Sequence, residues 1–240
     1  MSKIYEALKK AEEERDRGRL RAPLPPAAPL VAEPSSVIQE DYQRLRASVL
    51  SITVPAGLHT IMVASSRHGE GATTVALGLS TALARERDTR VLLMEANLRS
   101  PSLRYLLPVD APLGLSDYAL GRAAPEAIVT RVDAWNLSVI PAGSQPAATV
   151  GVEAMDALLT RLQAQFDFMV VDVAPVNVYA DASVLAPKVD GVILVVEADR
   201  TPVVEAEAAK RQLDKVGARI LGVVLNRQRS YIPAFIENLL

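Results

Sequence analysis

The sequence lacks cysteine altogether, and it lacks a strong excess of charge of either sign. With no thiol among the 240 residues, a disulfide framework, a thiolate metal site and a cysteine nucleophile are all excluded. The 26 Lys and Arg residues nearly balance the 28 Asp and Glu residues. Because proteins grip the nucleic-acid backbone mainly through Lys and Arg, we do not expect DNA or RNA as a main partner.

The sequence also lacks a hydrophobic run long enough to cross a bilayer. Its apolar runs, such as residues 191–196, stay below ten residues, whereas a membrane-spanning helix needs about 20. Residues 1–21 are charged throughout, unlike a secretory signal with its apolar centre. We therefore expect a cytoplasmic protein without direct transmembrane insertion.

What the sequence does contain is enough apolar material for a core, divided among three segments. Half of the residues are hydrophobic and 22% are charged, which is typical of a globular chain. Residues 1–22 are predicted to form a charged helix, and residues 23–35, with five prolines, a stiff extended linker. A capping pattern that begins at Ser36 marks the start of a globular domain over residues 36–240.

The predicted first helix carries Ile4, Tyr5 and Leu8 on one narrow face. A helix with such a face is either a solvated charged helix or a docking helix whose apolar face needs a partner to cover it. Both interpretations remain open at the level of sequence. Either way, the proline-rich linker holds this helix at a distance from the domain.

In the domain, apolar strand-like runs alternate with helical patterns. The helix that opens it has apolar residues every three or four positions: Ile38, Tyr42, Leu45, Val49 and Ile52. The strand-like runs are residues 59–65, 90–96, 136–142, 168–173, 191–197 and 219–226, and the helical patterns are residues 73–86, 152–165 and 203–216. This alternation predicts an α/β fold with a doubly wound, mostly parallel sheet and helices on both faces.

The first predicted strand runs directly into a glycine-containing loop and then a helix, over Ser65–Thr74. In that context backbone N–H groups wrap phosphates, Gly69 and Gly71 allow close approach, and Thr73 is placed to hold Mg²⁺. A phosphate loop also requires Lys immediately before that threonine, and here the residue is Ala72. The segment is therefore either a nucleotide loop without its cation or only a tight turn.

Three other strand ends carry polar side chains. Glu95 and Asn97 follow the second strand-like run, Asp172 ends the fourth, and Asn226 ends the last. Because ligands lie at the carboxyl ends of strands in such sheets, these residues are candidates for metal, nucleophile and base contacts. Taken singly, each has the alternative interpretation of an ordinary loop cap or turn residue.

Taken together, these motifs resemble the bacterial tyrosine kinase (BY-kinase) family of capsule and exopolysaccharide assembly, which is related to the MinD/ParA P-loop ATPases. The resemblance covers nearly the whole globular part, and the leader MSKIYEALKKAE (1–12) shares it. It rests on SSRHGEGATT (65–74), VLLMEANLRSPSL (91–103), GLSDYALG (114–121), NLSVIPAG (136–143), FDFMVVDVAPV (166–176), DASVLAPKVDGVILVV (181–196) and GARILGVVLNR (217–227). It implies a P-loop NTPase fold of the MinD/BY-kinase type.

At the nucleotide site, matches and departures both occur. The resemblance implies nucleotide contacts at Gly69, Glu70, Gly71, Ala72, Thr73, Thr74, Arg99 and Asn226, and a Mg²⁺ site at Thr73 and Asp172. Asp181 also matches, whereas the family lysine is Ala72 and the two aspartates of the second motif are Glu95 and Asn97. Losing the lysine and a carboxylate predicts a pseudokinase, with vestigial Glu95, Asn97 and Asp172, that binds ATP or ADP with Mg²⁺ weakly or not at all. Arg67, inside the loop, is the candidate substitute for the lysine, although it comes from a different point on the loop.

The resemblance also implies partners. In the family a Glu-x-x-Arg-x-x-Arg pattern drives self-association, and here Glu40 and Arg46 match while the middle arginine is Gln43. A homo-oligomer is thus implied but weakened. Since we expect no transmembrane helix, the resemblance implies a separate chain-length-determinant (co-polymerase) partner, which would hold the protein at the inner membrane. Only Tyr231 of the six tyrosines lies near the C-terminus, so the family's phosphorylated tyrosine cluster is missing.

The predicted function is a catalytically degenerate regulatory or scaffold protein in exopolysaccharide or capsule polymerisation and export. An active tyrosine autokinase of the same pathway is the alternative. A ParA-like or MinD-like positioning ATPase ranks last, because Ser65, Ser66 and Arg67 supply no signature lysine early in the loop.

Overall fold

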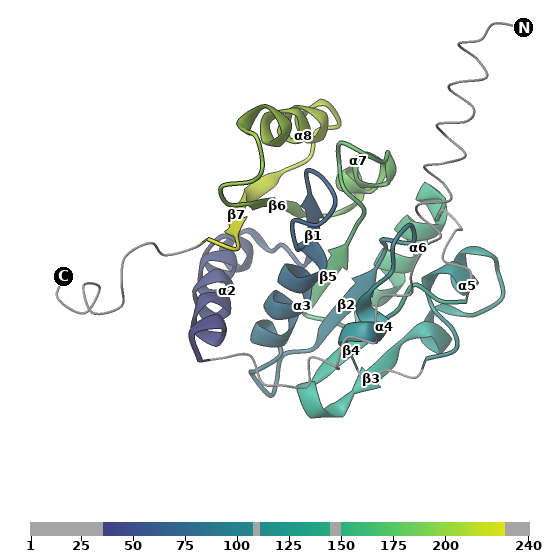
Figure 1. Cartoon of the computed structure of the whole chain (residues 1–240). Coiled ribbons are helices and arrows are strands. Elements are labelled where there is room, and N and C mark those ends of the chain that lie inside the picture. Colours follow the sequence, from purple (N-terminus) through teal and green to yellow (C-terminus); the bar gives the residue numbers. More distant parts are fainter. Residues whose placement is uncertain (1–35, 108–110, 145–149, 229–240) are drawn as a thin grey trace, which may run out of the picture.

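The computed structural model describes residues 36–107, 111–144 and 150–228. Within them a single sheet lies between two layers of helices (Figure 1). The strands are β1 (Thr60–Ser65), β2 (Val91–Glu95), β3 (Thr130–Val132), β4 (Leu137–Ile140), β5 (Phe168–Asp172), β6 (Gly191–Glu197) and β7 (Ile220–Asn226). The α-helices are α2 (Ser36–Ala56), α3 (Ala72–Leu83), α4 (Leu103–Leu106), α5 (Leu115–Ala119), α6 (Val152–Gln163), α7 (Asp181–Leu185) and α8 (Val203–Lys215), and the 3₁₀ turns are η1 (Pro125–Ile128), η2 (Asp133–Trp135) and η3 (Ala186–Lys188).

The sheet has seven strands in the order β3-β4-β2-β5-β1-β6-β7. All neighbours are parallel except β3, which runs antiparallel to β4 at one edge. The inner strands are continuously apolar because both of their faces are covered by helices. The predicted doubly wound, mostly parallel α/β fold is therefore confirmed.

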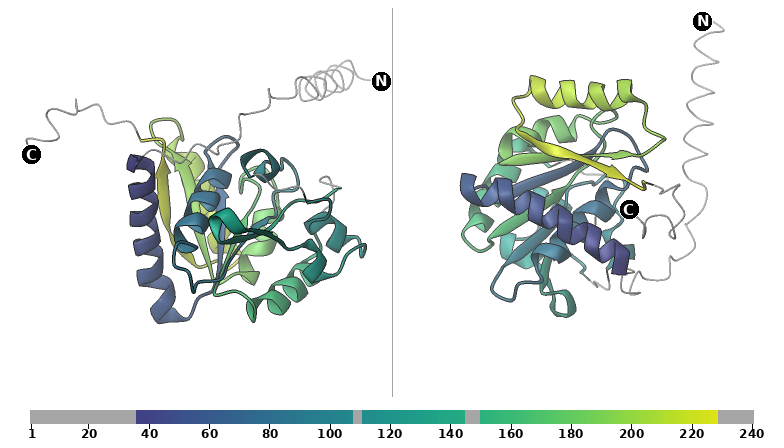
Figure 2. Two further views of the ribbon diagram at one scale, coloured as in Figure 1. Left: turned by 90° about the horizontal axis from the view of Figure 1, so that it is seen from below. Right: turned by 90° about the vertical axis from the view of Figure 1, so that its left-hand side faces the viewer.

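Two apolar clusters fill the spaces on either side of the sheet. On one face, α2, α3 and α4 pack on the strands (Figure 2), with residues such as Val49, Leu79 and Leu103 buried. On the other face, α5, α6, α7 and α8 contribute residues such as Leu158 and Leu213. Both layers lie along parallel strands whose carboxyl ends meet at one edge, and that edge is where the predicted site residues are found.

One aromatic ring of helix α2 packs directly on α3. The side chain of Tyr42 lies so close to Gly78 of α3 that a Cβ built at Gly78 would fall 2.2 Å from the ring carbons. The Tyr42 hydroxyl donates a hydrogen bond of 3.2 Å to the carbonyl oxygen of Thr74. Burial raises the pKa of this phenol, and the charge of Asp41 raises it further. Gly78 is therefore required by its neighbour and not by its own backbone conformation.

Gly78→Ala is expected to destabilise the protein by about 1–3 kcal/mol, because its methyl group must displace a packed ring. In a Tyr42→Ala background the same substitution is expected to stabilise by about 1 kcal/mol, since alanine then contributes only its higher helix propensity. Urea unfolding of the four proteins in this double-mutant cycle measures both effects. An equal destabilisation in both backgrounds would show that the ring does not set the cost.

The predicted apolar face of α2 is correct in its middle and wrong at its end. Val49 is 4% exposed and Tyr42 and Leu45 are half-buried, but Ile52 is 37% exposed. Thr53 is buried in its place, with its hydroxyl satisfied by a 2.9 Å hydrogen bond to the carbonyl of Val49. Near its C-terminal end, α2 thus buries Thr53, whose hydroxyl is hydrogen-bonded within the helix, in place of the apolar Ile52.

Some elements were not expected from the sequence. They are the short strand β3 and the helices α4, α5 and α7, each of five residues or fewer. Elements this short have too few residues to show a hydrophobic period. Among the described helices, none combines the length and the apolar character needed to cross a membrane. The predicted helix over 1–22 and linker over 23–35 lie outside the described residues.

Candidate functional site

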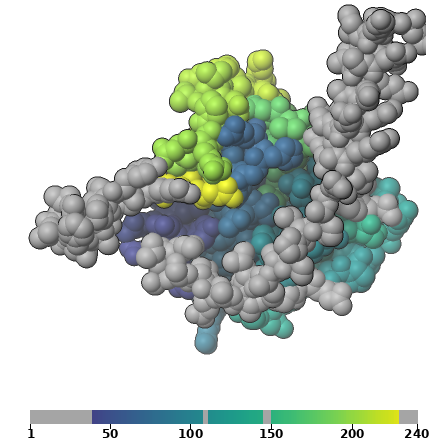
Figure 3. Space-filling view, viewed as in Figure 1, coloured from purple at the N-terminus to yellow at the C-terminus, as the bar shows by residue number. Residues whose placement is uncertain are grey.

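The predicted phosphate loop connects β1 to α3 and has the backbone conformation of a phosphate cradle. Gly69 and Gly71 adopt positive φ angles of 87° and 90°, a region that favours glycine. A Cβ at Gly71 would lie 2.2 Å from Nδ2 of Asn226, so the loop also leaves no room for a side chain there. In the space-filling view the blue segment that carries this loop reaches the surface beside the yellow-green of α8 (Figure 3). The loop is therefore built as the sequence predicts, with its first helical residue at Ala72.

The side chain of Glu70 holds the loop from within. This fully buried carboxylate accepts hydrogen bonds from the backbone N–H groups of Ser66 (2.7 Å) and Arg67 (3.0 Å) and from the Ser66 hydroxyl (2.8 Å). The hydroxyl of Thr201, just before α8, donates to it as well. Glu70 thus shapes the loop, and its carboxylate is not directed at a ligand.

Thr73 and Asp172 form a close pair at the base of the loop. The Thr73 hydroxyl donates a 2.8 Å hydrogen bond to Oδ2 of Asp172, whose side chain is completely buried at the end of β5. Burial raises the pKa of Asp172 to about 8, against the hydrogen bond from Thr73 and with the charge of Glu95 adding to it. The second oxygen, Oδ1, has no hydrogen-bond partner among the described residues. A buried carboxylate oxygen without a partner fits Mg²⁺, which proteins bind through one or two carboxylates, hydroxyls, waters and phosphates.

A cavity of about 290 Å³ opens above this pair. Its walls include Gly69, Gly71, Ala72, Thr73 and Thr74 from the loop and Asn97 from the β2 end. The Ala72 side chain is 8% exposed and packs with the apolar cluster beneath α3. The position that holds the phosphate-binding lysine in a P-loop therefore supplies no cation to this cavity.

Two basic side chains border the cavity, those of His68 and Arg227. Arg227 directly follows β7 with a φ of 57°, and its Nη1 lies 3.3 Å from Oε1 of Glu197. The sequence analysis did not single out Arg227 as a site residue. The signal available was its place immediately after the strand-end Asn226, in the segment GARILGVVLNR.

Arg67 does not take the place of the missing lysine. Its Nη2 donates a 2.6 Å hydrogen bond to the carbonyl of Arg200, and its Nη1 lies 3.5 Å from a carboxylate oxygen of Glu205. Its Nε is 3.7 Å from Glu70. These contacts tie the guanidinium to the start of α8, and Arg67 is not among the residues that border the cavity.

The two residues of the second motif have different roles. Glu95 is 1% exposed, and its Oε1 accepts hydrogen bonds from the backbone N–H groups of Ser102 (2.5 Å) and Leu103 (2.7 Å). Its Oε2 accepts from Ala142 at 3.1 Å. Burial raises the pKa of Glu95 despite these hydrogen bonds. Glu95 therefore braces the β2 and β4 ends, and only Asn97, which accepts a 3.3 Å hydrogen bond from Ser100, borders the cavity.

Arg99 and Asn226, predicted to contact nucleotide, are engaged with protein. Arg99 forms an ion pair with Asp181, with Nε 3.2 Å from Oδ2, and its guanidinium lies 5.3 Å from the ring centre of Tyr179. Asn226 donates from Nδ2 to the carbonyl of Glu70 at 2.8 Å, which clamps the phosphate loop to β7. Neither residue borders the cavity.

The predicted self-association residues lie on α2 with partners in the same chain. Glu40 accepts a 2.6 Å hydrogen bond from Arg44, one turn further along the helix. Arg46 pairs through Nη2 with Glu86, and its Nε is buried without a hydrogen-bond partner among the described residues. The docking face of Ile4, Tyr5 and Leu8 lies outside the described residues.

Comparison with known proteins agrees with this geometry. The ParA family model, described as a NUBPL iron-transfer P-loop NTPase, matches residues 58–237. Tyrosine-protein kinase YwqD of Bacillus subtilis is 27% identical over 202 residues, which cover 83% of this chain and 85% of YwqD. Succinoglycan biosynthesis transport protein ExoP of Rhizobium meliloti is 27% identical over 204 residues, 82% of this chain but 26% of ExoP. The solved structure of the chimerical protein CapA2B2 has a TM-score of 0.76 at 25% identity and covers 83% of this chain and 88% of that chain.

Proposed function

The chain belongs to the ParA family of P-loop NTPases, and on that basis we propose that it is a catalytically degenerate relative of the bacterial tyrosine kinases. In this proposal it acts as a regulatory or scaffold protein in exopolysaccharide or capsule polymerisation and export. The similarity to a tyrosine-protein kinase and to a succinoglycan transport protein supports the pathway. No iron transfer is proposed, because a chain without cysteine has no thiolate for an iron–sulfur cluster.

The observation that carries the proposal is the methyl group of Ala72 at the lysine position of an otherwise formed phosphate loop. A charge-assisted hydrogen bond is worth about 1.5–3 kcal/mol in ordinary settings, and more where the charge of a phosphoryl group in transfer must be stabilised. Arg67 is tied to α8 and Arg227 to Glu197. The His68 ring contacts the Tyr179 ring edge-on, with the ring centres 5.5 Å apart. Among the described residues, no Lys or Arg without a protein partner therefore borders the cavity.

The remaining parts of the site are suited to binding more than to chemistry. Thr73 and Asp172 would hold Mg²⁺, with Asp172 Oδ1 as the unpartnered ligand. When bound with a nucleotide, the ion would screen the negative charge of the phosphates. The backbone N–H groups of the loop would surround the phosphates. Glu95 is held by three backbone N–H groups, so it is not free to take a proton from an attacking hydroxyl.

The proposal includes a membrane partner of the chain-length-determinant type, with the protein peripheral to the inner membrane and in the cytoplasm. The covered quarter of ExoP is the basis for this inference, since there a similar domain is part of a longer transport protein. Self-association through α2 is a further part of the proposal. The middle arginine of the family pattern is Gln43 in this chain. Glu40 pairs with Arg44 inside α2, which weakens the contact that Glu40 would make with a second copy.

An active tyrosine autokinase is the second candidate function. The intact Thr73 and Asp172 pair favours it, because that pair is the metal-binding part of a phosphoryl-transfer site. The two candidates differ in one product, phosphotyrosine.

The deciding experiment incubates the purified full-length chain with Mg-ATP and measures phosphotyrosine by mass spectrometry. We expect none on any of the six tyrosines, because transfer needs a cation at position 72. YwqD treated in the same way serves as the comparison protein. Phosphotyrosine that accumulates with time in the wild type and is absent from the Asp172→Asn variant would establish the autokinase instead.

A further inference from the structure

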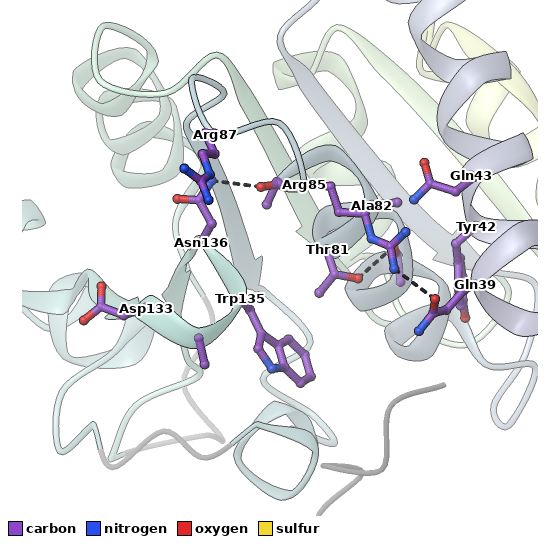
Figure 4. Close-up of a pocket in the computed structure, with 13 residues that line it drawn as sticks. Gln39, Tyr42, Gln43, Thr81, Ala82, Arg85, Arg87, Asp133, Trp135 and Asn136 are labelled. Carbon is purple, nitrogen blue, oxygen red and sulfur yellow. Dashed lines mark hydrogen bonds between the residues drawn. The ribbon is translucent and has the colours of Figure 1, made fainter. Parts of the chain in front are cut away.

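A second and larger hollow, of about 580 Å³, lies at the opposite end of α3 from the phosphate loop (Figure 4). It is bordered by α2, by the segment that follows α3 and by η2. On α3 the nearest lining residues of the two hollows, Thr74 and Gly78, are four positions apart, about 6 Å along the helix. The volume falls in the range of about 300–1,000 Å³ that is usual for small-molecule sites.

Two arginines on the rim of this hollow have no carboxylate partner in the described part of the chain. Arg85 and Arg87 are both exposed, and Arg85 makes one polar contact, a 3.1 Å hydrogen bond from Nη2 to Oε1 of Gln39. Of the acidic residues nearby, Glu86 binds Arg46 and Asp88 is exposed. Asp133, on the wall of the hollow, lies 3.5 Å from Arg131 and its side chain is 94% exposed. The walls of the hollow therefore carry two arginines against one aspartate.

An aromatic side chain lies across the hollow from Arg85, whereas Arg87 lies apart, beside Asn136 (Figure 4). In Figure 4 the indole of Trp135 and the guanidinium of Arg85 stand on opposite sides of the hollow, with Thr81 between them. Trp135 is half-buried and packs against the apolar cluster beneath α3. Its ring is thus supported from below and open toward the hollow.

The two sides of the hollow are fastened to each other by Asn136, the residue after Trp135. Its Nδ2 donates a 2.8 Å hydrogen bond to the carbonyl of Ala84, and its Oδ1 accepts from Arg131. Its φ of 50° lets one side chain reach both partners. The Trp135 ring and the arginine-bearing segment are therefore held in a fixed relation, which reduces the ordering cost of binding.

We propose that this hollow binds a pyranose sugar that carries one anionic group, either a uronate carboxylate or a phosphate monoester. Arg85 would bind the anion, since guanidinium groups match both kinds of oxyanion, and Arg87, on the other side of the hollow beside Asn136 in Figure 4, would add positive charge to the rim. The indole of Trp135 offers a flat apolar surface to the C–H face of the ring, and the amides of Gln39 and Gln43 on α2 are donors and acceptors for its hydroxyls. A nucleotide fits less well, because the positive-φ glycines that wrap phosphates lie at the other end of α3. The proposal does not depend on nucleotide binding at the phosphate loop.

The chain itself supplies the probe for this proposal, because Trp135 is its only tryptophan. The full-length protein is titrated with glucuronate and with glucose 1-phosphate while tryptophan emission is followed, with glucose and AMP as matched controls. We expect a saturable change with at least one anionic sugar and none with glucose. The two anionic sugars distinguish a carboxylate ligand from a phosphate ligand.

Variants then locate the binding. Arg85→Gln is expected to weaken it at least tenfold and Arg87→Gln by a smaller factor, whereas Arg161→Gln, at an exposed arginine of α6 that pairs with Glu126, leaves it unchanged. Calorimetry on Trp135→Phe, where the optical signal is gone, is expected to show weakened binding as well. No saturable change with either anionic sugar, unchanged binding in the Arg85 variant, or preferential binding of AMP would each overturn the proposal.

Discussion

Asp172→Asn is expected to flatten the pH dependence of stability in the metal-free protein. The folded-state pKa of Asp172 is raised to about 8, whereas an aspartate in the unfolded chain titrates near 3.9. Between these values the unfolded state releases a proton that the folded state keeps. The free energy of unfolding of the wild type therefore falls as the pH rises, by up to about 1.4 kcal/mol per pH unit.

From about pH 5 to about pH 8 the free energy of unfolding of the wild type is expected to fall by as much as 4 kcal/mol through Asp172. The Asp172→Asn variant lacks this contribution. Urea unfolding in EDTA at several pH values measures it. The comparison is made between the slopes of the two proteins, so that any packing cost of the amide, which is present at every pH, cancels. Asp88→Asn is the matched control, because Asp88 is an exposed aspartate. Parallel pH profiles for the wild type and Asp172→Asn would contradict the buried, proton-holding carboxyl.

Ala72→Lys is expected to create or strengthen nucleotide binding at the phosphate loop. Ala72 and Thr73 both border the cavity, so we expect a lysine at position 72 to reach into it. One charge-assisted contact worth about 1.5–3 kcal/mol corresponds to roughly 10- to 150-fold tighter binding of Mg-ATP. The thermal unfolding midpoint with and without millimolar Mg-ATP reports the change, because a ligand at 100 times its Kd adds about 2.7 kcal/mol of stability.

Ala72→Met separates charge from volume in this experiment, since methionine has a chain of similar length without the ammonium group. We expect little shift with Mg-ATP in the wild type and in Ala72→Met, and a clear upward shift in Ala72→Lys. A folded lysine variant that shows no shift would count against the assignment of this cavity to nucleotide. An equal shift in wild type and lysine variant would mean that the loop binds without its cation, and would favour the active-kinase alternative.

The layered fold could be predicted from the sequence because its main strands and helices are long and strongly patterned. The run over 191–197 is continuously apolar up to its last residue, and the helix over 152–165 shows the helical period over several turns. The antiparallel edge strand β3 has three residues and α4 has four, so neither carries a period. Their positions are set by tertiary contacts, such as the hydrogen bonds that Glu95 accepts at the start of α4.

The candidate site was predictable where a role follows from backbone position. The glycines of the loop and the placement of Thr73 opposite Asp172 depend on strand ends meeting at one edge of the sheet. Roles that depend on side-chain partners were not predictable. Glu70 turns inward to Ser66, and Asn226 clamps the loop, although the sequence suggested ligand contacts for both. The polar character of a residue does not reveal which of several polar partners it will reach in the fold.

The contact between Tyr42 and α3 has a mechanical consequence. The Tyr42 side chain connects α2 to α3, since its ring packs on Gly78 and its hydroxyl donates a hydrogen bond to the carbonyl oxygen of Thr74. Thr74 follows the residue that pairs with Asp172. A displacement of α2 is therefore transmitted by this side chain directly to the backbone beside the phosphate cavity.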